Sequence, residues 1–170
     1  MKTYIFQSYL QSLARNKGAT IGRNCYIHPG LLKKANSNLS VGCDTIINSD
    51  KFDLRCKIKI GNNVIINSGV KIITASHNHN SIEYETTYKE VALQDYCWIA
   101  TGATLLPGSE VGYGAIVGAE SVIRGRVQDM SIMIGNPAVE VKKRLNVHSN
   151  LVTSSLQGMD FEYYVQARKS

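Results

Sequence analysis

An apolar residue returns every six positions in the middle of the chain, at Leu93, Ile99, Leu105, Val111, Val117 and Ile123. Neither an α-helix nor a β-strand has this period, because helical faces repeat about every 3.6 residues and strand faces simply alternate. Four positions after each apolar residue comes a mostly small one, at Cys97, Ala103, Ser109, Ala115, Ser121 and Val127. The pattern predicts a coil in which each hexad forms one short strand and one tight corner. We expect three hexads to complete one triangular turn, and successive turns to stack at a strand spacing of about 4.8 Å.

The first coils are less regular than those that follow. The steps from Ile21 to Val41 and from Val41 to Ile60 are longer, by two positions and by one, than the step from Leu93 to Val111. Extra residues in a repeating coil predict bulges at its corners. We expect Ile27 and then Leu31 or Leu32 to continue the first coil.

The period breaks between Ile72 and Leu93, which are separated by three and a half hexads. Residues 77–92 are mostly polar and show no inward aliphatic frame. We therefore predict a loop expelled from the coil, of the kind that carries function on a rigid scaffold. The predicted β-helix domain spans residues 19–145, and residues 146–170 form a tail for which the sequence indicates no structure.

Residues 1–18 are predicted to form a capping helix. The apolar residues Ile5, Tyr9, Leu10 and Leu13 have helical spacing, and Gly18 follows as a stop. Such a helix would cover the backbone of the first coil, which has no strand beyond it. The alternative, a membrane-surface helix, is less favoured because the polar face holds Gln and Ser and not Lys and Arg.

Composition limits the possible partners and the compartment. The chain carries a net charge of +6, but its 19 Lys and Arg are scattered and only residues 142–144 form a tight basic group. This distribution argues against nucleic acid and favours a small phosphorylated ligand. The four cysteines lack C-x-x-C spacing, so we expect reduced thiols and a cytoplasmic protein. No signal peptide is indicated, and no apolar run approaches the roughly 20 residues that membrane insertion requires.

Three short motifs are specific to a known family. They are Asp95-Tyr-Cys-Trp-Ile-Ala-Thr101, Leu105-Leu-Pro-Gly108 and Gly135-Asn-Pro-Ala138. Together they resemble the hexapeptide-repeat acyltransferases, most closely the galactoside, maltose and polysaccharide O-acetyltransferase branch. The resemblance implies an all-β fold, a left-handed parallel β-helix. It also implies a homotrimer with active sites between subunits, acetyl-CoA as the acyl donor and no metal.

The resemblance places the catalytic histidine at His77, where the expelled loop begins, facing the next subunit. A neutral imidazole with a pKa near 6.5 can take the proton of an acceptor hydroxyl as its oxygen attacks the thioester. Asn48 matches a family asparagine that reaches the acceptor across the interface, where an amide can both donate and accept. The group that orients His77 stays open among a backbone carbonyl and four nearby acidic residues, Glu83, Glu85, Glu90 and Asp95.

Acetyl-CoA, by the same resemblance, would lie in a groove between adjacent coil stacks. Small residues would let the pantetheine arm approach main-chain amides, and basic residues would meet the phosphates. The positions that match are Trp98, Thr101, Ala119, Arg124, Gly125 and Lys142. Trp98 would either flank the arm or pack between subunits.

Two other sites are disfavoured by the residues themselves. His77 and His79 have H-x-H spacing, but a zinc site of the carbonic anhydrase type needs a third histidine, and only His28 and His148 remain, both badly placed. Cys97 occupies a corner position, where a small buried residue is expected, and has no adjacent histidine to activate it.

The function predicted from the sequence is acetyl transfer from acetyl-CoA to a hydroxyl of a sugar or surface-polysaccharide precursor. The reaction would run in a ternary complex without an acyl-enzyme. The alternatives left open are N-acetylation of a nucleotide-linked amino sugar, acetylation of a xenobiotic hydroxyl, and a non-catalytic β-helix that only binds a partner.

Overall fold

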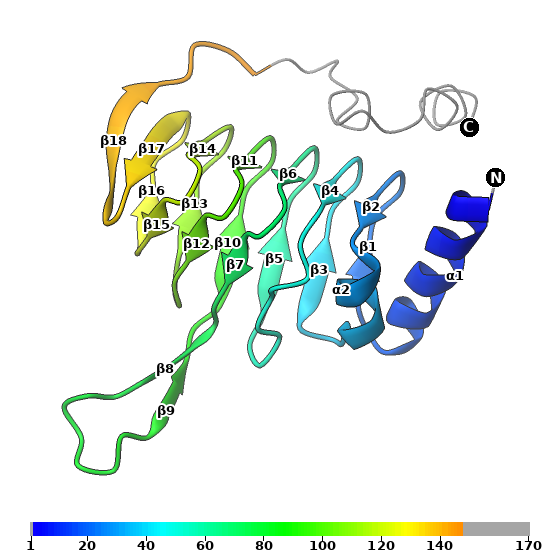
Figure 1. Cartoon of the computed structure of the whole chain (residues 1–170), viewed down its shortest axis with the longest axis horizontal. Helices are drawn as coiled ribbons and strands as arrows, with labels where there is room; N and C mark the ends of the chain where they lie inside the picture. The colour runs from blue at the N-terminus through cyan, green and yellow to red at the C-terminus, as the bar shows by residue number, and fades with distance from the viewer. Residues whose placement is uncertain (1, 148–170) are drawn as a thin grey trace.

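The computed structural model describes residues 2–147, which form a parallel β-helix of triangular cross-section (Figure 1). Sheet A contains β1 (Thr20–Ile21), β3 (Leu39–Val41), β5 (Ile58–Ile60), β10 (Val91–Leu93), β13 (Glu110–Val111) and β16 (Arg126–Val127). Sheet B contains β2 (Tyr26–Ile27), β4 (Ile46–Ile47), β6 (Ile65–Ile66), β11 (Trp98–Ile99), β14 (Ile116–Val117), β17 (Ser131–Gly135) and β18 (Ala138–Lys143). Sheet C contains β7 (Lys71–Ile72), β12 (Thr104–Leu105) and β15 (Val122–Ile123). The β-helix of hexapeptide repeats expected from the sequence is confirmed.

The core is a set of aliphatic ladders that run along the β-helix. Residues one coil apart are parallel partners, as in Leu93 with Val111 and Ile99 with Val117. All the apolar residues of the six-residue period are buried. The small corner residues are buried too, and the thiol of Cys97 donates to the carbonyl of Gly112 at 3.1 Å. Each coil is therefore held by its neighbours through both backbone pairing and packing.

The first coil departs from the prediction, because its third side is the helix α2 (Pro29–Lys34) and not a strand. Leu31 and Leu32 are buried as expected, but they reach the core from this helix. Pro29 suits the first helical position, since its missing N–H would be unpaired there in any case. The ring of His28 caps the helix by accepting from the backbone N–H of Gly30 at 3.1 Å.

The last full coil is shorter than the period requires. Val127 was predicted at a corner, but it lies inward in β16 and pairs with Val111. The step from Val111 to Val127 is two positions shorter than three full hexads. Gly125 explains the difference, because its φ of +78° turns the chain back toward sheet A after a single exposed residue, Arg124.

The capping helix α1 (Lys2–Asn16) packs against the first coil, but with a face other than the predicted one. Leu10 is buried as expected, whereas Ile5, Tyr9 and Leu13 are exposed. The buried face is Gln7, Leu10, Gln11 and Ala14. The prediction of the inward face from apolar spacing alone was wrong.

Hydrogen bonding explains why glutamines face inward. The amide of Gln7 donates to the carbonyl of Ile27 at 3.1 Å, and that of Gln11 donates to the carbonyl of Cys25 at 2.8 Å. These carbonyls belong to the first coil, beyond which no strand remains to pair with them. A glutamine amide supplies the missing donor, which an aliphatic side chain cannot do.

Within residues 2–147, no helix has the length and apolar character to cross a bilayer.

Two antiparallel hairpins extend the β-helix. At the far end β17 pairs antiparallel with β18. In the middle, the chain leaves the coil after β7, forms β8 (Ala75–His77) and β9 (Thr86–Tyr88), and returns at β10. Figure 1 shows this second hairpin projecting well away from the coil stack. It occupies the place of the predicted expelled loop.

The cap predicts a measurable stability effect at Gln11. Replacing Gln11 with Ala leaves the buried carbonyl of Cys25 without its donor, so the free energy of unfolding should fall by about 1–3 kcal/mol. The matched control is Ser12→Ala, an exposed position on the same helix, which should change it by less than about 0.5 kcal/mol. Urea denaturation of both variants measures this. Equal stability of the two variants would contradict the capping role.

Candidate active site

Most of the residues predicted to form the site lie on two edges of the triangular prism. We name the edges by the sheets they join, so the B–C edge follows the strands of sheet B and the C–A edge follows those of sheet C. Asn48, Thr101 and Ala119 lie on the B–C edge. Arg124 and the hairpin that carries His77 lie on the C–A edge. Sheet C separates the two edges within one chain.

His77 is the last residue of β8, and its exposed ring is held by a backbone carbonyl. Its Nδ1 lies 2.7 Å from the carbonyl oxygen of Tyr84, across the hairpin. Because a carbonyl oxygen can only accept, Nδ1 carries the proton and Nε2 of the neutral ring keeps its lone pair. Tyr84 has a φ of +47°, a conformation that non-glycine residues seldom adopt. The hairpin thus presents a histidine whose free nitrogen can act as a base.

The carbonyl of Tyr84 is the orienting group that the sequence had left open. Three of the acidic candidates have other partners: Glu85 accepts from Asn78, Glu90 pairs with Lys59, and Asp95 accepts from Asn62. A carbonyl gives no sequence signal, so this partner could not have been chosen from the residues alone.

Asp53 fixes the base of the same hairpin, and the sequence analysis did not single it out. Its carboxylate pairs with Arg55, with 2.8 Å between Oδ1 and Nε, and accepts from the backbone N–H of Thr74 at 3.3 Å. The Thr74 hydroxyl donates to the Asp53 carbonyl at 2.8 Å, and the carbonyl of Thr74 accepts from the N–H of Lys89 at 2.8 Å. Hydrogen bonds from Arg55 lower the pKa of Asp53 to about 2. Both strands of the hairpin are therefore anchored at its root, where it joins the coil.

The B–C edge carries the predicted acceptor position and two of the predicted cofactor positions. Asn48 directly follows β4 and is half-buried, and its backbone N–H donates to the carbonyl of Ile66 at 2.8 Å. Further along the edge, Thr101 and Ala119 are exposed on neighbouring coils, and the N–H of Glu120 donates to the carbonyl of Thr101 at 2.9 Å. Thr101 and Ala119 have small side chains, whereas the carboxylate of Glu120 lies over the backbone of Gly102 on the same part of the edge.

Trp98 lies on the outer face of sheet B, shortly before Thr101 in the chain. Its side chain is 42% exposed, and its neighbours on the adjacent strands are Ile65 and Ile116. A large apolar ring in this position suits contact with a ligand or with another subunit.

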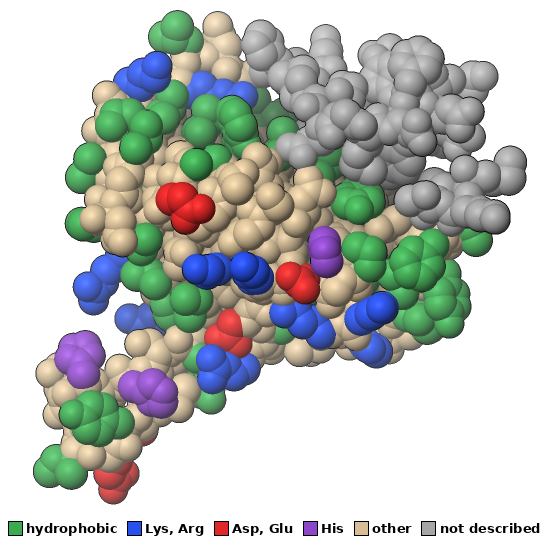
Figure 2. Space-filling view, viewed as in Figure 1, with side chains coloured by type: hydrophobic (Ala, Val, Ile, Leu, Met, Phe, Trp, Pro, Cys, Tyr) green, Lys and Arg blue, Asp and Glu red, His purple; other side chains and the backbone are tan. Residues whose placement is uncertain are grey.

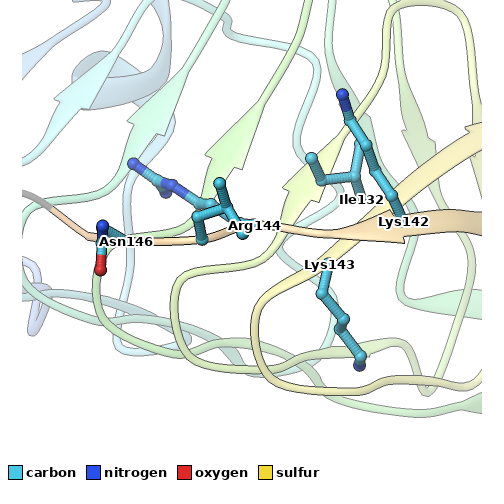
Figure 3. A pocket seen from close by; sticks show the side chains of 6 residues that line it. Ile132, Lys142, Lys143, Arg144 and Asn146 are labelled. Atoms are coloured by element: carbon cyan, nitrogen blue, oxygen red, sulfur yellow. The ribbon is translucent and has the colours of Figure 1, made fainter.

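Basic residues gather at the β17–β18 hairpin, around a cleft of about 460 Å³ (Figure 3). In Figure 3, Lys142 points to the same side of β18 as Ile132, whereas Lys143 points to the opposite side. Lys143 is bound to Ser131 at 2.8 Å, and Arg144 donates to the carbonyls of Tyr96 and Gly114, each at 3.2 Å. Lys142 has no such bond within residues 2–147, so it is the cation of this group best able to bind an anion.

The structure does not bring all the predicted cofactor residues together. Lys142 belongs to sheet B at the far end of the β-helix, whereas Arg124 and Gly125 lie on the C–A edge. Gly125 has the turning role described above. In a single chain these residues do not line one pocket.

Two features of the structure bear on the alternative sites, a nucleophilic Cys97 and a metal centre. Burial raises the pKa of the Cys97 thiol to about 12, so this cysteine is a packed core residue and not a nucleophile. In the part of the chain that the structure describes, no group of three His, Cys, Asp or Glu side chains is placed to hold a metal ion. His148 lies outside those residues, as does most of the predicted tail.

Comparison with known sequences finds relatives that are acetyltransferases. The chain is 29% identical over 134 residues to WcaF of Escherichia coli, whose name assigns it to colanic acid biosynthesis as an acetyltransferase, covering 78% of this chain and 74% of that protein. It is 27% identical over 145 residues to the galactoside O-acetyltransferase of Lactococcus lactis, covering 79% and 67%. No protein-family model matches the sequence.

Comparison with solved structures finds the same fold. A hexapeptide-repeat acetyltransferase of Vibrio cholerae, crystallised with acetyl coenzyme A, superposes with a TM-score of 0.70. The match covers 84% of this chain and 85% of that one at 20% sequence identity. At this identity the likeness concerns the fold.

The anchor at the hairpin root predicts a pH-dependent effect of Asp53→Asn. The folded pKa of about 2 lies below the usual value of about 3.9, so the carboxylate stabilises the fold above pH 4 and loses this effect as the pH falls toward 2. The variant should lower the free energy of unfolding at pH 7 by about 1–3 kcal/mol, and the difference should shrink in acid. Glu83→Gln, exposed in the same hairpin, is the control. Urea titrations across this pH range test it, and a constant difference would contradict the assignment.

Proposed function

Since the relatives that the chain resembles are acetyltransferases, we propose that it transfers an acetyl group from acetyl-CoA to a hydroxyl of a sugar or surface-polysaccharide precursor. The observation that supports this most directly is His77, whose Nδ1 is held by a backbone carbonyl so that Nε2 is left as a base. The relatives named above act on galactosides or serve colanic acid biosynthesis, which favours a carbohydrate hydroxyl as the acceptor.

In the proposed reaction the two substrates meet without an acyl-enzyme. Nε2 of His77 takes the proton of the acceptor hydroxyl while its oxygen attacks the thioester carbon of acetyl-CoA. The tetrahedral intermediate then collapses, the carbon–sulfur bond breaks, and the histidine returns the proton to the departing thiolate. The carbonyl of Tyr84 stabilises the imidazolium that forms between these steps, because it accepts from Nδ1 throughout.

The separation of the two edges supports a homotrimer as the active form. His77 and Asn48 lie on different edges of one chain, with sheet C between them. In a parallel trimer the C–A edge of one copy lies beside the B–C edge of the next, so each site takes His77 from one copy and Asn48 from its neighbour. The projecting hairpin gives His77 the reach that this arrangement needs.

Acetyl-CoA fits the same arrangement. Thr101 and Ala119 offer an edge of small side chains to the pantetheine arm, with Trp98 beside it, and a neighbouring backbone N–H would stabilise the oxyanion. Lys142, and Arg124 of the adjoining copy, are exposed cations for the phosphates. Their places, at the far end of sheet B and on the C–A edge, agree with a groove lined by two copies.

Substitution of His77 tests the base directly. His77→Ala should lower the rate of acceptor-dependent CoA release by about 10²- to 10⁴-fold, the usual contribution of a general base. His79→Ala, exposed two residues further along the loop, should keep the wild-type rate. The assay uses hydroxyl-bearing glycan fragments in one panel and nucleotide-linked amino sugars in another. Equal rates for both variants would remove His77 from the mechanism, and release only with amines would indicate N-acetylation.

Mixed trimers test whether the site is shared. His77→Ala and Asn48→Ala should each be inactive alone, but their co-expression should restore about a quarter of wild-type activity, because random assortment pairs one intact His77 with one intact Asn48 at that share of interfaces. The measurement is CoA release by the co-purified protein, with its mass taken by light scattering. A monomeric mass with full activity in the wild type would contradict the proposal.

A further inference from the structure

Helix α1 turns its apolar side chains away from the protein. Ile5, Phe6, Tyr9 and Leu13 are 62%, 47%, 60% and 38% exposed, and we call these four residues the α1 face. Figure 2 shows hydrophobic side chains gathered at this end of the molecule. An isolated exposed apolar residue needs no explanation, but four on one helix, with glutamines buried on the other side, form a patch of the kind that marks an interaction site.

The charged residues are also distributed unevenly along the sequence. Residues 1–43 contain six Lys and Arg and no Asp or Glu, whereas residues 44–170 contain thirteen of each kind. The net charge of +6 therefore equals the excess of Lys and Arg in residues 1–43. The basic residues are scattered along the sequence, and two carboxylates of the second coil lie near them: Asp44 accepts from Asn24, and Asp50 lies beside Gly30 of α2.

Several of these cations lie beside the α1 face. Helix α2 packs against α1, and the Nζ of Lys17 donates to the carbonyl of Lys33 at 2.9 Å. Arg15, Lys17, Lys33 and Lys34 are all exposed, and we call them the basic rim. Figure 2 shows Lys and Arg side chains over the α2 region, next to the hydrophobic group.

From this combination we infer that the α1 face and the basic rim dock the protein on the surface of an anionic lipid bilayer. An apolar helix face enters the boundary between headgroups and acyl chains, and lysines beside it meet the anionic headgroups. A nucleic acid would use the rim but leave four large apolar side chains in water. A second copy packed end to end would bring the cations of two basic rims together.

The position of the docking surface leaves the proposed active site free. The α1 end lies opposite the β17–β18 hairpin, and the β8–β9 hairpin projects to the side between them (Figure 1). In the proposed parallel trimer, three α1 faces would share one end and bind the same membrane, which strengthens weak single contacts. This last point rests on the trimer, whereas the docking surface itself does not.

Vesicle sedimentation of the full-length protein tests the inference. The probes are vesicles of phosphatidylcholine alone and of phosphatidylcholine mixed equally with phosphatidylglycerol. The wild type should bind the anionic vesicles at least about tenfold better, and added salt should weaken this binding. Phe6→Ser combined with Tyr9→Ser should lower the binding about tenfold or more, since both side chains leave the bilayer boundary.

Two further variants separate the apolar and electrostatic parts. Lys33→Gln combined with Lys34→Gln should weaken binding to anionic vesicles and reduce its salt dependence. It carries the test alone if the Phe6 and Tyr9 variant does not fold. Ile134→Ser combined with Val139→Ser, exposed apolar positions at the far end, is the matched control and should bind as the wild type does.

Two results would overturn the docking surface directly: equal binding of the wild type to both vesicle types, or binding as tight as that of the wild type by the α1 and lysine variants. A third is that the wild type binds no vesicles and the Phe6 and Tyr9 variant has a smaller mass in solution than the wild type. The last would identify the face as a contact between copies. None of these measurements needs acetyl-CoA or an acceptor, so their failure leaves the acetyl-transfer proposal standing.

Discussion

The structure depends on one constraint, that every coil pairs its backbone with the coil above and the coil below. In sheets A and B this pairing continues from the first coil to the last, and the aliphatic ladders fill the space that the coils enclose. The two ends have no further coil. At the far end β18 folds back on β17, and at the near end α1 supplies glutamine amides to the carbonyls of Ile27 and Cys25. Because the cap uses polar side chains, the apolar residues of α1 are left on the outside.

The same regularity decides where function can be placed. A coil of hexads has flat sides and tight corners, and only an insertion at a corner can carry a side chain away from it. The β8–β9 hairpin is that insertion, and Asp53 and Thr74 fix its root while Tyr84 orients the histidine at its side. The rigid stack then holds Asn48 and the small residues of the other edge in register. In the proposed trimer, this division of residues between two edges would place each site between two copies.

Much of this was predictable because the repeat is a local signal. The six-residue period identified the β-helix, and the break after Ile72 located the hairpin. The errors occurred where three-dimensional pairing overrides local pattern. Apolar spacing placed Ile5, Tyr9 and Leu13 on the wrong side of α1, since unpaired carbonyls select glutamine instead. Val127 was misplaced because one glycine, Gly125, shortened the coil. A hydrogen-bond partner that is a backbone carbonyl, such as that of Tyr84, cannot be identified from residue type, because every residue has one.

The central claim is that one copy supplies the base and the next copy supplies the edge that holds the substrates. The most direct measurement is a crystal structure of the protein with CoA and a sugar acceptor bound. The account predicts that the sulfur of CoA and an acceptor hydroxyl oxygen lie about 3–3.5 Å apart. Nε2 of His77 from one copy and Asn48 of its neighbour should lie on either side of them. A thiol group bound within a single copy, or one distant from every His77, would contradict it.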